Sequence, residues 1–99
     1  MTIQVAGFRH TGRFEKDLRA APPDVVLAAR NALNLLQQNP DSKALRLHLL
    51  KQFGKPGVWK IDVFSNHAWQ LTFELEEGGI AKLCRLAMHK KIDLSPRAD

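Results

Sequence analysis

The sequence predicts a single α+β domain, in which a short N-terminal strand and two helices pack on a small antiparallel sheet. In the first half of the chain, apolar residues recur at helical spacing. In the second half they alternate with polar residues, and short turn signals separate the alternating runs. The full length, residues 1–99, falls within the size range of one domain with one core.

The N-terminal part of the chain predicts a strand and then a brief helix. Residues 2–6 form a short alternating run that is typical of an edge strand. Phe14 and Leu18 lie one helical turn apart and follow Gly12, which favours a short helix there. We expect both elements to pack on the sheet that the second half provides.

A longer helix is expected next in the chain. Asp24 follows two prolines and is a good N-cap residue, and Asn39 and Pro40 end the helix after Gln38. The spacing of i, i+3, i+7 and i+10 places one apolar stripe on the side of this helix that faces the sheet. The stripe consists of Val26, Ala29, Leu33 and Leu36.

The second half predicts a three-stranded antiparallel meander. Residues 59–63, 69–75 and 80–86 form the strands, and residues 65–68 and 76–79 form the turns between them. Because side chains alternate between the two faces of a sheet, the polar residues of these strands share one face. That face is the candidate working surface, and its members are Lys60, Asp62, Gln70, Thr72 and Arg85.

The charge of the chain favours an anionic partner. The net charge is +5 and the sequence pI is about 9.8, and such a balance attracts nucleic acid or acidic protein segments. Within residues 43–60 basic residues occur without any Asp or Glu. The stretch predicts a local positive patch, although a solvated face that maintains solubility would give the same pattern. Its basic residues are Lys43, Arg46, Lys51, Lys55 and Lys60.

Several classes of protein are disfavoured. No apolar run approaches the length of about 20 residues that spans a bilayer, and the N-terminus lacks the layout of a signal peptide. We therefore expect a cytoplasmic protein without a membrane partner. Cys84 is the only cysteine, which excludes an intramolecular disulfide and predicts a buried, inert thiol. The histidines lack the spacing of metal ligands, so no metal or other cofactor is expected.

Two histidines are candidate catalytic residues. His48 and His89 stand at the two ends of the second half, each beside basic residues. An unperturbed imidazole has a pKa of about 6.5 and exchanges protons near neutrality, while neighbouring cations can hold a phosphate. The combination predicts chemistry on RNA. The other conspicuous residues are assigned to turns, packing or no particular role, and they are His10, His67, Trp59 and Trp69.

The order of strand, two helices, basic connection, meander and C-terminal histidine resembles the RelE/ParE superfamily of small toxins from toxin–antitoxin systems. The resemblance covers nearly the whole chain. The segments that carry it are residues 14–18, 35–40, 47–50, 58–63, 69–73 and 85–89.

The resemblance implies a function in translation control. Members of the mRNA interferase branch cut mRNA in the ribosomal A site without a metal, and an antitoxin encoded beside them neutralises them by forming a toxin–antitoxin hetero-oligomer. By similarity, His48 and His89 are the acid–base residues. The residues expected to bind phosphate or RNA are Lys51, Lys55, Arg85 and Gln70, and those expected to contact the ribosome are Lys43, Arg46, Lys90 and Lys91.

The chain also departs from the family pattern. Gln70 stands where many members carry an arginine that faces the scissile phosphate, and a neutral amide cannot supply that charge. Ala87 and Met88 replace the usual Gly-Thr pair before the histidine. Three alternatives therefore remain: a catalytically weakened relative, a ParE-type toxin that binds DNA gyrase without catalysis, and a plain RNA- or protein-binding module.

Overall fold

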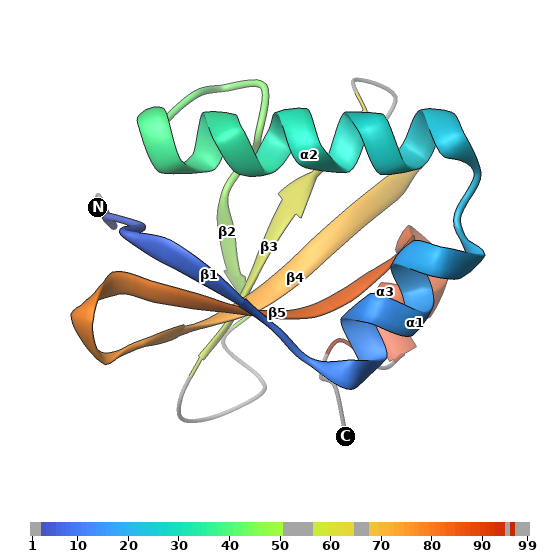
Figure 1. Cartoon of the computed structure of the whole chain (residues 1–99). Helices are drawn as coiled ribbons and strands as arrows, with labels where there is room; N and C mark the ends of the chain where they lie inside the picture. Colours follow the sequence, from blue (N-terminus) through green and yellow to red (C-terminus); the bar gives the residue numbers. More distant parts are fainter. Residues whose placement is uncertain (1–2, 51–56, 65–67, 95, 97–99) are drawn as a thin grey trace.

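The computed structural model describes residues 3–50, 57–64, 68–94 and 96. Within these residues it contains a five-stranded mixed sheet with strand order β1-β5-β4-β3-β2 (Figure 1). β1 pairs parallel with β5, and the other neighbours are antiparallel. In chain order the elements are β1 Gly7–His10, α1 Gly12–Ala20, α2 Pro23–Gln38, β2 His48–Leu50, β3 Val58–Asp62, β4 Trp69–Glu76, β5 Ile80–Met88 and α3 His89–Leu94.

Both predicted N-terminal helices are confirmed, with one correction at a helix start. The Thr11 hydroxyl caps α1 by accepting a hydrogen bond from the backbone N–H of Phe14. α2 begins at Pro23 with Pro22 as its N-cap residue, so the prediction of Asp24 as N-cap is wrong. Proline suits the first helical position because it lacks the N–H that would remain unpaired there. Asp24 lies in the first turn instead, where a carboxylate interacts favourably with the helix dipole.

The predicted strand at residues 2–6 is wrong in its position. Pairing with β5 begins only at Gly7, which lies opposite Ile80. Before that point, the backbone N–H of Ala6 donates to the carbonyl of Gly79 in the turn that precedes β5, so there is no strand for the segment to pair with. The alternation still has a structural reason, because Ile3 and Val5 are buried in the core.

The predicted meander is confirmed as β3, β4 and β5, and it forms the centre of a larger sheet. β2 adds a further antiparallel strand that the sequence did not predict, and β5 extends to Met88. A bulge at Thr72/Phe73 leaves Cys84 as an extra residue in β5, where its thiol is buried as predicted. α2 lies across one face of the sheet (Figure 1). The buried core includes Ala29, Leu36, Ile61, Leu71 and Phe73.

The described residues contain a third helix, which the sequence reading did not predict. α3 follows β5 without a loop, and its Ile92 is fully buried. Beyond α3, the carbonyl of Pro96 accepts a hydrogen bond of 2.6 Å from the buried hydroxyl of Thr72. The C-terminal segment therefore covers part of the polar face of the sheet. Across the described ranges, no helix combines the length and apolar character needed to cross a membrane.

Candidate functional site

The strand register aligns four of the highlighted polar residues in one row. His48 on β2 lies opposite Lys60 on β3, Lys60 lies opposite Thr72 on β4, and Thr72 lies opposite Arg85 on β5. Cross-strand partners in register share a face, so this row lies on the polar face. Exposure changes along the row: His48 is exposed, Lys60 is half-buried, and Thr72 and Arg85 are buried.

A second row lies beside the first. Asp62 is in register with Gln70, and Gln70 donates a hydrogen bond of 3.1 Å from its amide nitrogen to Asp62 Oδ1. The other carboxylate oxygen, Oδ2, lies 3.2 Å from Nε of Arg46. The Asp62 side chain is only 2% exposed, whereas that of Arg46 is 55% exposed. The carboxylate is thus buried beneath a guanidinium that faces solvent.

The predicted working surface is largely covered. Arg85 is drawn to the edge of the sheet, where its Nε lies 2.7 Å from Oδ2 of Asp17 on α1. Thr72 is held by Pro96, and Gln70 and Asp62 are buried against each other. The expectation that all five polar residues form an open surface is therefore wrong.

Part of the polar face remains accessible at its β2 edge. Arg46 and His48 are exposed there, and Lys60 is half-buried between them and the covered part. We call these three residues the cationic strip. Lys43 lies exposed in the loop before β2 and adds to the same positive edge. The strip combines a histidine with cations on adjacent strands, which is a suitable arrangement for binding and protonating a phosphate group.

The second candidate histidine lies elsewhere on the sheet. His89 is the first residue of α3, is exposed, and donates its backbone N–H to the carbonyl of Ala68. Lys90 and Lys91 follow it and are also exposed. β3 and β4 lie between β2 and β5, so three strand spacings, roughly 14 Å, separate the backbones of His48 and Arg85 in the same row, and His89 lies four residues farther along the chain. The structure does not bring the two histidines into contact.

The remaining predicted site residues divide into two groups. Lys51 and Lys55 lie outside the described residues. Gln70 is described and is buried behind Asp62, with its amide nitrogen already bonded. Sequence reasoning assigned no role to Asp17, and it placed Asp62 on the polar face without predicting that it pairs with Arg46. The only local signal for Asp17 is Arg13 four residues earlier, a spacing typical of an ordinary surface ion pair.

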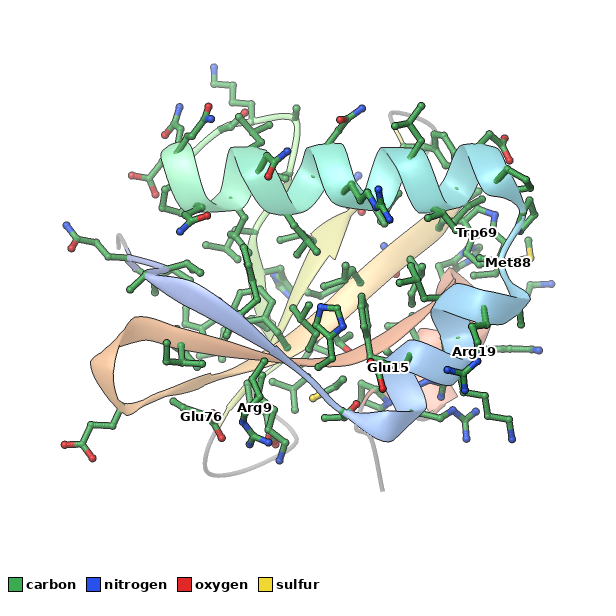
Figure 2. All side chains as sticks on the ribbon, in the orientation of Figure 1. Arg9, Glu15, Arg19, Trp69, Glu76 and Met88 are labelled. Atoms are coloured by element: carbon green, nitrogen blue, oxygen red, sulfur yellow. The ribbon has the colours of Figure 1, made fainter. Side chains whose placement is uncertain are left out.

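A further ion pair lies at the opposite end of the sheet. Arg9 on β1 and Glu76 at the end of β4 face each other with 2.6 Å between Arg9 Nη2 and Glu76 Oε2 (Figure 2). The hydrogen bonds from Arg9 lower the pKa of Glu76 below its usual value, and the same bonds raise the pKa of Arg9. This pair joins β1 to the meander and lies apart from the cationic strip in the strand order.

The described part of the chain contains no group of three or more His, Cys, Asp and Glu side chains that could hold a metal ion.

Comparison with solved structures shows which fold this is. No protein-family model and no curated protein sequence matches the chain. The RelE chain of an archaeal RelE–RelB complex from Pyrococcus horikoshii OT3 matches with a TM-score of 0.62 and 13% identity, over 89% of this chain and 96% of that one. A chain of the RelB–RelE antitoxin–toxin complex from Methanococcus jannaschii matches with a TM-score of 0.58 and 24% identity, over 88% and 98%.

A third solved structure is similar to the same extent. It is a copper-bound mutant toxin from Helicobacter pylori, with a TM-score of 0.58 and 20% identity, over 92% of this chain and 99% of that one. In all three cases nearly the whole of both chains is matched. The similarity therefore extends over the complete domain and is not limited to a short structural motif. This chain has the fold of the RelE toxins.

Proposed function

We propose that this protein is the toxin of a type II toxin–antitoxin pair and that it cleaves mRNA on the ribosome. The observation that carries the proposal is the cationic strip, a histidine flanked by Arg46 and Lys60 on an open sheet edge of a RelE-type fold. Two of the solved relatives are complexes with an antitoxin, which supports a cognate antitoxin as the partner of this chain.

The proposed reaction needs no group beyond the side chains. A base removes the proton of a 2′-hydroxyl, whose oxygen attacks the adjacent phosphorus, and an acid protonates the departing 5′-oxygen. The products are a 2′,3′-cyclic phosphate and a free 5′-hydroxyl. His48 is suited to one proton transfer, and the neighbouring Lys60 ammonium is suited to stabilise the charge on the phosphorane.

His89 is proposed for the second proton transfer. Both proton transfers act on oxygens of the same phosphodiester, so the separation of the two histidines requires either that both side chains reach toward one phosphate or that another group replaces one of them. Lys90 and Lys91 on α3 and Lys43 before β2 are exposed cations, suited to contact ribosomal RNA through phosphates.

The experiment that tests the proposal is 5′-end mapping of a defined mRNA in a reconstituted translation reaction. Purified wild-type protein is compared with His48→Ala, His89→Ala and the double variant. His10→Ala is the matched control. His10 is also an exposed histidine, and it lies at the end of β1, the strand at the opposite edge of the sheet from β2. We expect cuts at A-site codons with the wild type and the control, and at least a hundredfold slower cutting with His48→Ala.

Two observations favour a second candidate function. The separation of the two histidines and the burial of Arg85 and Gln70 are compatible with a ParE-type toxin that binds DNA gyrase by protein contact. Intact mRNA in every reaction, with folded protein in excess over ribosomes, would reject the nuclease. Inhibition of gyrase supercoiling by the same preparation would then support the binding toxin, and inhibition by the double histidine variant would show that no acid–base chemistry is involved.

A further inference from the structure

Arg46 has an unusual backbone conformation. Its φ is +48°, and it is the non-glycine residue with positive φ in the described part of the chain. For a side chain other than glycine, asparagine or aspartate, the left-handed region is sterically unfavourable, because Cβ approaches the following carbonyl oxygen. Such strain persists where surrounding contacts enforce it, and it occurs preferentially at functional sites.

The contact that accompanies this conformation is the ion pair with Asp62. The backbone N–H of Asp62 donates to the carbonyl of Leu45, which fixes the chain immediately before Arg46 against the end of β3. The Asp62 carboxylate then meets Nε of Arg46 and the amide of Gln70. A carboxylate that is 98% buried orients a guanidinium more strictly than an exposed one, because it has few alternative positions.

The geometry leaves Arg46 available for a further ligand. The contact to Asp62 uses Nε, while more than half of the Arg46 side chain faces solvent. An arginine held through one nitrogen is preorganised to bind a phosphate with the others, because the guanidinium donates in a planar fork. Arg46 precedes β2, whose first residue, His48, follows two positions later in the sequence.

A hollow lies beside Arg46. Its lining brings together the loop after α2 and the β2–β3 edge. Trp59 and Leu47 give it an apolar wall; both are half-buried, so part of the indole remains accessible. Arg46 and Lys43 supply cations, and Asp41 is the carboxylate on the rim. An aromatic ring beside cations is the usual composition of a surface that stacks an unpaired base and binds its phosphate.

We propose that this hollow is a nucleotide-binding subsite, in which a single-stranded RNA base packs on Trp59 while its phosphate binds Arg46. Asp62 is the positioning residue, which acts only through Arg46. The inference rests on the proposed function, since it assumes that the protein binds RNA. Trp59 is in register with Leu49 and Phe73, on the opposite face of β3 from Lys60, so the hollow is a separate contact at the β2 edge and does not adjoin the His48 side chain. The inference also changes the assignment of Trp59, which the sequence pattern placed in packing alone, and of Arg46, which was expected to contact the ribosome.

The test measures binding of a short, fluorescently labelled single-stranded RNA over a series of salt concentrations, without ribosomes. Arg46→Asn removes the guanidinium and retains a residue that tolerates positive φ. We expect a five- to tenfold loss of affinity and a salt slope lower by about 0.7, the value of one lost phosphate contact on a single strand. Asp62→Asn keeps the shape of the side chain, and we expect a smaller loss in the same direction. Arg30→Ala, an exposed arginine on α2, is the charge-matched control.

A second measurement detects stacking of the base directly, through the fluorescence of Trp59. Trp59 and Trp69 are the two tryptophans of the chain, so Trp69→Phe isolates the fluorescence of Trp59. Stacking of a base predicts strong quenching on addition of RNA, and Trp59→Leu should weaken binding about tenfold with an unchanged salt slope. Circular dichroism of each variant establishes that it is folded.

The outcomes separate the subsite from the function. If the wild type binds and cleaves RNA while Arg46→Asn behaves as Arg30→Ala does, or Trp59 is not quenched, the subsite is rejected and the nuclease stands. If the wild type binds no free RNA but cleaves mRNA on the ribosome, the subsite is rejected and the nuclease stands; if it neither binds nor cleaves RNA, both are rejected.

Discussion

Asp17 on α1 binds Arg85 on β5 across 68 positions of sequence, with 2.7 Å between Oδ2 and Nε. The same oxygen accepts the backbone N–H of Leu86, where β5 has passed the end of β1 and its edge is open. α1 thus replaces β1 as the neighbour of this edge. Because both side chains are nearly buried, the pair fixes Arg85 in the structure and removes it from the accessible part of the polar face.

Replacement of Asp17 by Asn should destabilise the protein by about 3 kcal/mol, because it removes the negative charge that binds the buried Arg85 guanidinium. Arg13→Ala removes the other, exposed partner of Asp17 and should cost less than about 1 kcal/mol. Urea unfolding of both variants gives the two values. Equal effects in the two variants would show that Arg85 finds another partner when Asp17 is lost.

The sequence predicted the elements whose pattern is local. The helix α2 and the β3–β5 meander have clear periods, and the structure confirms both. Of the predicted α2 stripe, Ala29 and Leu36 are buried, whereas Val26 and Leu33 are only half-buried and Val25 and Ala32 complete the buried face. β2 was missed because only three residues pair there, and α3 was missed because it continues from β5 without a turn signal. The strand at residues 2–6 was misplaced because alternation reports burial of Ile3 and Val5, and burial does not require a ladder partner.

Two glycines in the turn before β5 have the same backbone conformation but different space around an added Cβ atom, so each serves as the control for the other. Gly78 and Gly79 both have φ near +80°, so alanine at either position costs about 1 kcal/mol of backbone strain. A Cβ at Gly78 meets nothing within 4 Å, whereas at Gly79 it would lie 3.1 Å from the carbonyl oxygen of Gln4. Gly79→Ala should therefore be the more destabilising, with the lower melting temperature of the two variants. Equal melting temperatures would mean that the N-terminal segment moves away without cost.

The Arg9–Glu76 pair predicts a pH dependence of stability. The pKa of Glu76 is lower in the folded protein than in the unfolded chain, because Arg9 stabilises the carboxylate. The stabilisation that the Glu76 carboxylate gives to the folded protein is therefore present above the ordinary carboxyl pKa. It is lost as the pH falls through the lower pKa of the folded state. Glu76→Gln should lower the melting temperature at neutral pH, and the difference from wild type should close in acid. Glu77→Gln, at an exposed neighbouring position, should show no such convergence.

The candidate site was harder to predict than the fold. His48 and Lys60 were singled out individually, yet their pairing depends on β2, which pairs with β3 over only three residues. The polar face was predicted correctly from alternation, but alternation cannot show that α1 and the C-terminal segment return to cover Thr72 and Arg85. Long-range contacts of this kind leave no local signal, which is why Asp17 received no role and the pairing of Asp62 with Arg46 was not predicted.

Thr72 provides a test of how the C-terminal segment is held. Its hydroxyl donates to the carbonyl of Pro96, in a fully buried position on β4. Thr72→Val keeps the shape of the side chain but leaves that carbonyl without its donor, which should cost about 1–3 kcal/mol. α3, which begins at His89, lies between β5 and this anchor. If His89 takes part in cleavage, loosening the anchor should also slow the reaction.

Thr72→Ser is the matched control, because it retains the hydroxyl and loses only a methyl group. Hydrogen exchange of the backbone amides in α3, measured for both variants, separates a local effect from global destabilisation. We expect faster exchange in α3 of Thr72→Val than in Thr72→Ser, with the amides of β3 and β4 changing less. Identical exchange in the two variants would show that packing of Ile92 alone holds the segment, and that the hydrogen bond to Pro96 contributes nothing to the placement of His89.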